Sequence, residues 1–337
     1  MENAFNALAL MGNFVIVPAI AYGSQLALGA LGVTIVYGIL RFSNFAHGEV
    51  MSFGAMSALL TMWWMQSNGI SIAPFPTVLL ALPMAMVMTV AMLLAVDRLV
   101  FRHYRRKHSP PVVLLIASTG VMFVLNGVIR FIIGTDDHRI SDGERFILKA
   151  SEFKEATGLN EALVIKTSQL ISVAAAVICV AVLFWFLNKT RSGKSMRAYS
   201  DNEDLALLSG INPDRVVMLT WILAGILAAV AGTLYGLDKS YKPFTYLQLL
   251  LPIFASAIVG GIGNPVGAIV GGFVIAFSEI VLTYAYKRVF IYLVPESWAP
   301  DGMAQFLATD YKFAVSFMIL VVALIIRPTG IFSGRSL

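Results

Sequence analysis

Residues 73–96 read APFPTVLLALPMAMVMTVAMLLAV, a run without a single Asp, Glu, Lys or Arg. At 1.5 Å per residue, a helix of about 20 residues crosses roughly 30 Å of hydrocarbon, so this run has the length of a transmembrane helix. The strands of a membrane barrel would show segments of about ten residues with alternating hydrophobicity instead. The run therefore favours a spanning helix.

Similar apolar runs recur along the chain and are separated by short polar stretches. Hydrophobic residues make up 58% of the 337 residues and charged residues only 13%, which is far from the composition of a soluble domain. The sequence thus predicts an all-α integral membrane protein, a polytopic bundle of about eight to nine transmembrane helices that forms one domain over residues 1–337. The runs lie at about 13–38, 46–66, 73–96, 111–133, 165–187, 216–236, 247–263, 265–285 and 311–327.

The turn between the seventh and eighth runs is very short, since Gly260–Pro265 is all that separates them. These two runs could be two spans or a pair of re-entrant half-helices. Within the same region Gly263, Gly267 and Gly271 are spaced four apart, a pattern typical of close helix packing in membranes. We expect these glycines to serve packing rather than substrate contact.

The placement of Lys and Arg predicts the topology. Residues 98–107 hold four Arg and one Lys, residues 189–197 hold two of each, and Arg327 and Arg335 lie near the C-terminus. Nine crossings place all three groups on one side, which the positive-inside rule assigns to the cytoplasm. We therefore expect the N-terminus outside and the C-terminus in the cytoplasm. The net charge of +5 follows from this topology and requires no nucleic-acid partner.

Two connections are too long to be simple turns. The first, 134–164, mixes acidic and basic residues and is predicted to be a periplasmic insertion, either a docking site for a soluble partner or a solvated lid. The second, 188–215, is predicted to be a cytoplasmic loop with a short helix through Ala206–Leu208, capped by Asp201 or Asn202 and stopped by Gly210. Its apolar residues suit insertion into a cleft of another protein or packing on the membrane domain itself.

A polar island, residues 41–49, separates the first two apolar runs and reads Arg41-Phe42-Ser43-Asn44-Phe45-Ala46-His47-Gly48-Glu49. Polar groups near hydrocarbon are costly, so such a cluster usually lines water, a substrate route or a helix break. His47 and Glu49 are two residues apart, which is not the spacing that puts two metal ligands on one helical face. We expect no catalytic residue, no metal site and no enzyme activity in this chain.

Several motifs, taken in order, resemble those of one family. They are the island's Asn44–Glu49, Ser118-Thr119-Gly120, Gly193-x-x-x-Arg197-Ala198 with Leu207–Asn212, Ala231-Gly232, and Gly260–Ala268. From about residue 15 to 330 the chain resembles the permease subunits of high-affinity branched-chain amino-acid ABC importers. The island makes it similar to the LivH-type subunit rather than to its LivM-type partner.

The resemblance implies an uptake system in the bacterial inner membrane. A periplasmic binding protein delivers the amino acid, a LivM-type subunit completes the membrane pair, and two cytoplasmic ABC ATPases bind ATP and Mg and drive alternating access. This chain would need no cofactor of its own and would contact only these proteins, the substrate and membrane lipid. Two alternatives stay open: a urea or short-chain amide importer with a very similar permease, and a stand-alone channel or secondary carrier for a small polar solute.

The resemblance also assigns roles to residues. The stretch Asp204-Leu205-Ala206-x-x-x-Gly210 is similar to the coupling helix Glu-Ala-Ala-x-x-x-Gly of ABC importer permeases, which favours docking on an ATPase. Leu205 departs from that motif, so its packing against the ATPase stays open. For the substrate path, the candidates are Ser43, Asn44 and His47 in the island, with Thr119 and Asn126 on the fourth run. The alternative is that Asn44 and His47 cap and lock a broken helix while the substrate touches apolar walls.

Overall fold

A computed structural model describes residues 2–140, 142–293, 302–327 and 329–332 of the chain. Within these ranges, eight helical spans are long and apolar enough to cross a membrane. Helix α3 (His47–Ser67) is a further helix of 21 residues that falls outside this group, because polar residues at both of its ends lower its hydropathy. The eight spans are Glu2–Leu40, Val78–Arg106, Pro111–Ile133, Thr167–Lys189, Pro213–Lys239, Pro243–Gly260, Pro265–Thr283 and Thr309–Ile326.

Two spans extend beyond the predicted runs because short π-helical segments join consecutive helices. Gly12–Ile16 connects α1 (Glu2–Met11) to α2 (Val17–Leu40). Asp97–Phe101 connects α4 (Val78–Val96) to α5 (Arg102–Arg106). In contrast, α4 begins five residues later than predicted, since Pro74 and Pro76 lack the N–H groups that a helix uses.

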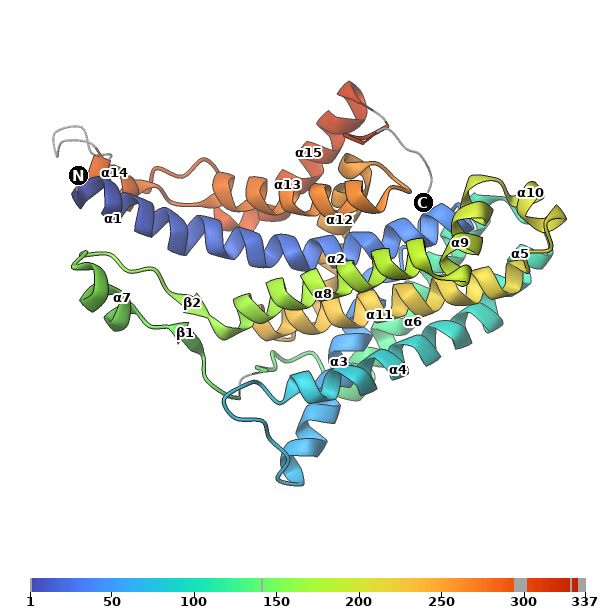
Figure 1. Cartoon of the computed structure of the whole chain (residues 1–337), viewed down its shortest axis with the longest axis horizontal. Helices are drawn as coiled ribbons and strands as arrows, with labels where there is room; N and C mark the ends of the chain where they lie inside the picture. Colours follow the sequence, from blue (N-terminus) through green and yellow to red (C-terminus); the bar gives the residue numbers. More distant parts are fainter. Residues whose placement is uncertain (1, 141, 294–301, 328, 333–337) are drawn as a thin grey trace.

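Helix α2 lies at the centre of the bundle (Figure 1), and nearly all of its residues from Ala19 to Ile39 are buried. It packs most extensively against α13 (Pro265–Thr283) and α11 (Pro213–Lys239). Helix α15 (Lys312–Ile326) lies at the edge and buries only Val315 and Ser316. The apolar outer face of such a helix is suited to lipid or to another subunit.

The remaining elements gather at the two ends of the bundle (Figure 1). One end holds α5, α9 (Arg191–Asp201) and α10 (Glu203–Leu208), so the two basic connections lie together. The other end, where α1 begins, holds α7 (Ala150–Thr157), α14 (Lys287–Leu293) and the antiparallel pair β1 (Phe146–Leu148) and β2 (Ile165–Lys166). Arg335 lies outside the described residues.

The seventh and eighth runs are two separate helices, α12 (Pro243–Gly260) and α13, and each has the length and composition of a span. The Asn264 side chain caps α13 by accepting hydrogen bonds from the N–H groups of Val266 and Gly267. The helices approach closely, because a Cβ on Gly267 would lie 2.3 Å from the Gly260 carbonyl oxygen and one on Gly271 would lie 2.0 Å from that of Ser256.

Gly263 differs from the other two glycines of the predicted packing motif. It lies in the turn before α13, has a φ of +88°, and has no heavy atom within 4 Å of the place a Cβ would occupy. Its position requires a left-handed backbone and makes no close helix contact. The spacing of four therefore combines a turn glycine with two packing glycines.

Candidate functional site

The polar island is a break between α2 and α3 that folds back into the bundle. Arg41 ends α2 in a left-handed conformation with a φ of 56°, and α3 starts six residues later at His47. The His47 ring lies against the middle of α2, since a Cβ on Gly32 would be 2.6 Å from its Cε1 atom. Gly32 is eight residues before Leu40, so α3 begins about 12 Å inside the end of α2.

Hydrogen bonds within the island hold the first turn of α3. The Asn44 Oδ1 atom accepts from the Ala46 N–H at 3.2 Å, and the Asn44 carbonyl accepts from the His47 N–H at 3.2 Å. The Asn44 and His47 side chains are buried, and the His47 Nε2 atom has no hydrogen-bond partner among the described residues. Ser43 is half-buried beside them. Asn44 thus fixes the break, while His47 brings an unsatisfied polar atom into the interior.

Helix α6 (Pro111–Ile133) places a polar stripe beside the island. The Ser118 hydroxyl accepts a hydrogen bond from the Phe45 N–H at 3.1 Å, and the Asn126 amide donates to Glu49 Oε1 at 2.7 Å. Thr119, Asn126 and Arg130 are spaced seven and four apart, so they share one face of α6, and all three are half-buried. The Thr119 hydroxyl donates to the Leu115 carbonyl of its own helix. A polar face on an otherwise apolar helix lines protein or water rather than lipid.

Sequence reasoning missed Ser118 and Arg130 as members of this group. Arg130 follows Asn126 by one helical turn, a spacing that could have revealed it. The contact between Ser118 and Phe45 joins residues 73 apart and had no signal in the sequence. Arg41 and Glu49, which flank the island, do not pair with each other: Arg41 donates to the Ser200 carbonyl and Glu49 accepts from Asn126.

Helix α10 lies at the end of the bundle that also holds α5 and α9, and it is capped at both termini. The Asn202 side chain accepts from the Leu205 N–H at 3.0 Å, so Asn202 rather than Asp201 is the N-cap. At the other end the Gly210 N–H bonds to the Leu207 carbonyl and the Ile211 N–H to the Ala206 carbonyl, which is a Schellman motif with Gly210 at φ +80°. The caps thus supply hydrogen-bond partners at both ends of a helix of six residues.

The apolar residues of α10 point in two directions. Ala206 is buried, whereas Leu205 is 61% exposed and Leu208 is 85% exposed. Asp204 is exposed in the first turn. An apolar surface of this kind on a rigid helix end is suited to insertion into a groove of another protein. The structure thus places Asp204, Leu205 and Ala206 in one capped helix and Gly210 in the turn that ends it.

Helix α9, which sequence reasoning treated as loop, connects α10 to the island. The Ser200 hydroxyl donates to the Gly38 carbonyl of α2 at 2.9 Å, and the Ser200 carbonyl accepts from Arg41. The Tyr199 hydroxyl donates to Glu203 at 2.5 Å, and burial together with this carboxylate raises the pKa of Tyr199, so the hydroxyl stays a donor. One short helix therefore contacts both candidate regions.

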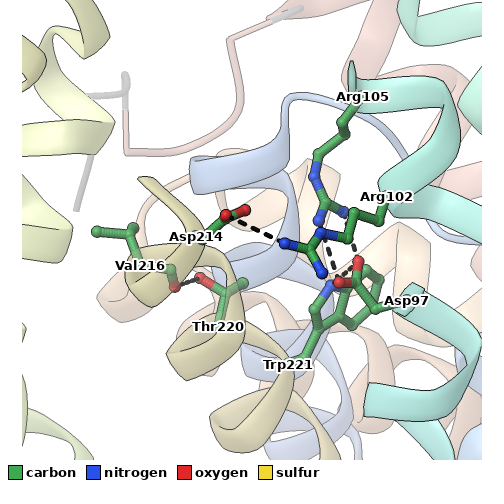
Figure 2. A network of polar contacts seen from close by, with 7 residues as sticks. All are labelled: Asp97, Arg102, Arg105, Asp214, Val216, Thr220 and Trp221. Atoms are coloured by element: carbon green, nitrogen blue, oxygen red, sulfur yellow. Dashed lines mark hydrogen bonds and ion pairs between the residues drawn. The ribbon is translucent and has the colours of Figure 1, made fainter. Parts of the chain in front are cut away.

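A second polar network anchors the same end of the bundle (Figure 2). Asp97 accepts from both terminal nitrogens of Arg105 and from the Trp221 indole N–H at 2.7 Å. The Trp221 ring stacks on Phe101 at 5.3 Å, and Phe101 in turn packs against Phe42 of the island. Arg102 bridges to Asp214 at 3.4 Å, near the start of α11. The network links the π-helical segment Asp97–Phe101 to α5 and α11 beside the island.

Comparison with known proteins identifies the family to which the chain belongs. The family model described as the permease component of branched-chain amino acid transport systems matches residues 15–324. The chain belongs to this permease family. The eight apolar helical spans of the described residues agree with a multi-pass membrane permease.

Three relatives in this permease family match almost their whole length. LivH of Salmonella typhimurium, a high-affinity branched-chain amino acid transport system permease protein, is 29% identical over 93% of this chain and 92% of its own. BraD of Pseudomonas aeruginosa, with the same description, is 26% identical over 94% of each chain. A probable branched-chain amino acid transport permease LivH of Methanocaldococcus jannaschii is 28% identical over 93% of this chain and 90% of its own.

Proposed function

We propose that this chain is the membrane subunit of an ATP-binding-cassette importer that carries branched-chain or related neutral amino acids into the cytoplasm. The proposal rests on the family match over residues 15–324 and on the transport systems named for the relatives. The chain itself would carry out no reaction. Its task is to offer a path that opens to one side of the membrane at a time.

The proposed orientation places the end with α5, α9 and α10 in the cytoplasm of a bacterial inner membrane. The support is the gathering of two basic connections at this end, in keeping with the positive-inside rule. The opposite end, with β1 and α7, would then hold the periplasmic insertion of residues 134–164, and β2 follows it directly. The N-terminus would lie outside and the C-terminus inside.

The proposed partners follow from the two ends. A periplasmic binding protein would dock on the insertion, a homologous permease subunit would lie beside this one, and two ATPases would hold the ATP and Mg. The observation that carries the ATPase proposal is α10, whose exposed Leu205 and Leu208 stand on a helix fixed by caps at both ends. Such a capped helix would transmit a displacement of the ATPase to the membrane subunit.

The proposed mechanism uses the contacts of α9. When the ATPases close, they would move α10, and Ser200 would carry this displacement to Gly38 and Arg41 at the end of α2. The island would then shift between α2 and α6, where Ser43, Asn44, His47, Thr119 and Asn126 are the proposed lining of the path. A break in regular structure is where a small displacement most easily changes helix positions.

Reconstitution tests the proposed function. The chain alone in liposomes should be inert, while the complex with its partner permease, ATPases and binding protein should take up leucine only with ATP. Transport by the chain alone would indicate a carrier and overturn the proposal. Uptake of urea or short-chain amides without leucine would overturn the amino-acid assignment.

Gly210→Val tests the docking role of α10 and has a matched control. Gly210 and Gly158 both follow a helix with positive φ, and neither has a heavy atom within 4 Å of the position that a Cβ would occupy. Val strains both turns equally, by about 1–2 kcal/mol. Gly210→Val should lower ATPase co-purification at least tenfold, whereas Gly158→Val, at the other end, should not. Equal retention by both variants would contradict the docking role.

A further inference from the structure

Two opposite charges face the interior beside the island without forming an ion pair. Glu49 is fully buried, and only its Oε1 atom is engaged, by the Asn126 amide at 2.7 Å. Its Oε2 atom has no hydrogen-bond partner among the described residues. Arg130 is close enough for its charge to act on Glu49. Among the ion pairs within 4.0 Å in the described chain, none joins the two residues.

The Arg130 side chain contacts an aromatic ring and forms no ion pair with Glu49. Its guanidinium lies 5.9 Å from the centre of the Phe244 ring on α12. Arg130 and Phe244 line a cavity of about 220 Å³ together with Thr135 and Pro243. An uncompensated carboxylate inside a membrane protein is costly, and a direct pair would reduce that cost. The separation of the Glu49 carboxylate from the Arg130 guanidinium therefore suits a site in which a ligand contacts both groups.

The chemistry of the two groups restricts what could bind them together. The free Glu49 oxygen accepts from an ammonium, and Arg130 offers planar paired donors to a carboxylate. A cation would be repelled by Arg130, and an anion by Glu49. A neutral amide or urea can hydrogen-bond to both groups, but it carries no charge that neutralises either of them. A zwitterion satisfies both, and the Phe244 ring with Pro243 offers an apolar surface to its side chain.

We propose that Glu49 and Arg130 form a recognition site for the α-ammonium and α-carboxylate groups of an amino acid passing along α6. Asn126 holds the Glu49 carboxylate in place, and the apolar side chain of the amino acid packs on Phe244. The site rests on the proposed function, since it needs an amino acid as cargo. It separates amino acids from uncharged solutes and adds Glu49 and Arg130 to the path residues.

The test uses the assembled importer in proteoliposomes, with leucine uptake and ATP hydrolysis measured in the same samples. Glu49→Gln keeps the Asn126 contact and removes the charge, and Arg130→Gln removes the other charge. Each should lower leucine transported per ATP hydrolysed about tenfold, a loss of about 1.4 kcal/mol. Binding-protein-stimulated hydrolysis should be unchanged, because the variants leave both docking surfaces intact. The matched controls Glu2→Gln and Arg98→Gln remove exposed charges and should behave like the wild type.

Each further outcome has a definite meaning. Variants that assemble and transport leucine with wild-type coupling overturn the site while leaving the proposed function in place. A wild-type complex that imports no amino acid overturns the proposed function independently of the variants. If Glu49→Gln fails to assemble, Glu49→Asp keeps the charge and shifts it by one methylene. Assembly of Glu49→Asp with lowered coupling then supports the site, and normal coupling overturns it.

Discussion

The polar island and helix α10 depart from the ordinary distribution of residues in opposite directions. The island buries Asn44, His47 and Glu49 inside an apolar bundle. Helix α10 exposes Leu205 and Leu208 at a polar end of the molecule. Buried polar groups and exposed large apolar groups are the informative exceptions in a protein, because each has a free-energy cost that function must justify. The first region is the proposed substrate route, and the second is the proposed docking surface for an ATPase.

The two regions also differ in how their glycines are used. Gly48 of the island is pressed against a neighbour, since a Cβ there would lie 2.7 Å from the Tyr246 carbonyl oxygen. Gly210 after α10 has open space and is needed only for its backbone conformation. The start of α3 at Gly48 is therefore packed closely against α12, while α10 is fixed by its own hydrogen bonds. Only the second arrangement leaves a surface free for a partner.

The largest expected effect comes from filling the island. Gly48→Val forces backbone atoms of α3 and α12 apart, and overpacking of this kind costs about 3 kcal/mol. Gly120→Val is the control, because Gly120 also lies in a helix and has no atom within 4 Å of a Cβ. The midpoint temperature of thermal unfolding in detergent should fall by several degrees for Gly48→Val and stay near that of the wild type for Gly120→Val. Equal stability of the two would mean that the island is not tightly packed.

A somewhat smaller effect is expected at the network behind the island. Asp97→Asn removes the charge that Arg105 pairs with twice, but an amide oxygen can still accept from Trp221. Because the Arg105 side chain keeps 20% exposure, we expect a loss of about 2 kcal/mol, below the 3–5 kcal/mol of fully buried pairs. Asp214→Asn breaks an exposed pair with Arg102 and should cost less than about 1 kcal/mol. The unfolding midpoints of the two variants measure the two losses of stability. A larger loss for Asp214→Asn than for Asp97→Asn would contradict this ranking.

Sequence reasoning succeeded where local pattern decides the structure. Run lengths predicted the spans, and Gly210 predicted the left-handed stop of α10. The bounds failed where π-helical segments join α1 to α2 and α4 to α5, because continuous helical backbone carries no stop signal. Gly263 was grouped with packing glycines because spacing cannot tell a turn from a helix. The spacing of Arg130 from Asn126 could have revealed Arg130, whereas the contact of Ser118 with Phe45 depends on tertiary structure that a single sequence does not reveal.

Ser200 of α9 lies between the island and α10. Its substitution should have a modest effect on stability but a clear effect on coupling, the amount of leucine taken up per ATP hydrolysed. Ser200→Ala removes the hydrogen bond to Gly38, worth about 1 kcal/mol. Leucine uptake per ATP hydrolysed should fall several-fold, since α9 would hold the end of α2 less firmly. Ser195→Ala, on the exposed side of the same helix, removes a hydrogen bond to Arg191 and should leave coupling unchanged. Loss of coupling in both variants would assign the effect to α9 as a whole.

The smallest effect on stability should come from Leu208→Glu. Leu208 is 85% exposed, so the charged side chain remains in water and the free energy of unfolding should change by less than about 0.5 kcal/mol. The ATPase should nevertheless be lost from the purified complex, because the new carboxylate would have to be buried in the ATPase groove that is proposed to receive the Leu208 side chain. Ile147→Glu, on β1 at the other end, places the same charge on a half-exposed apolar position and should keep the ATPase. Retention of the ATPase by Leu208→Glu would mean that the exposed apolar edge of α10 is covered by lipid or by the chain's own partner permease, and that docking uses another surface.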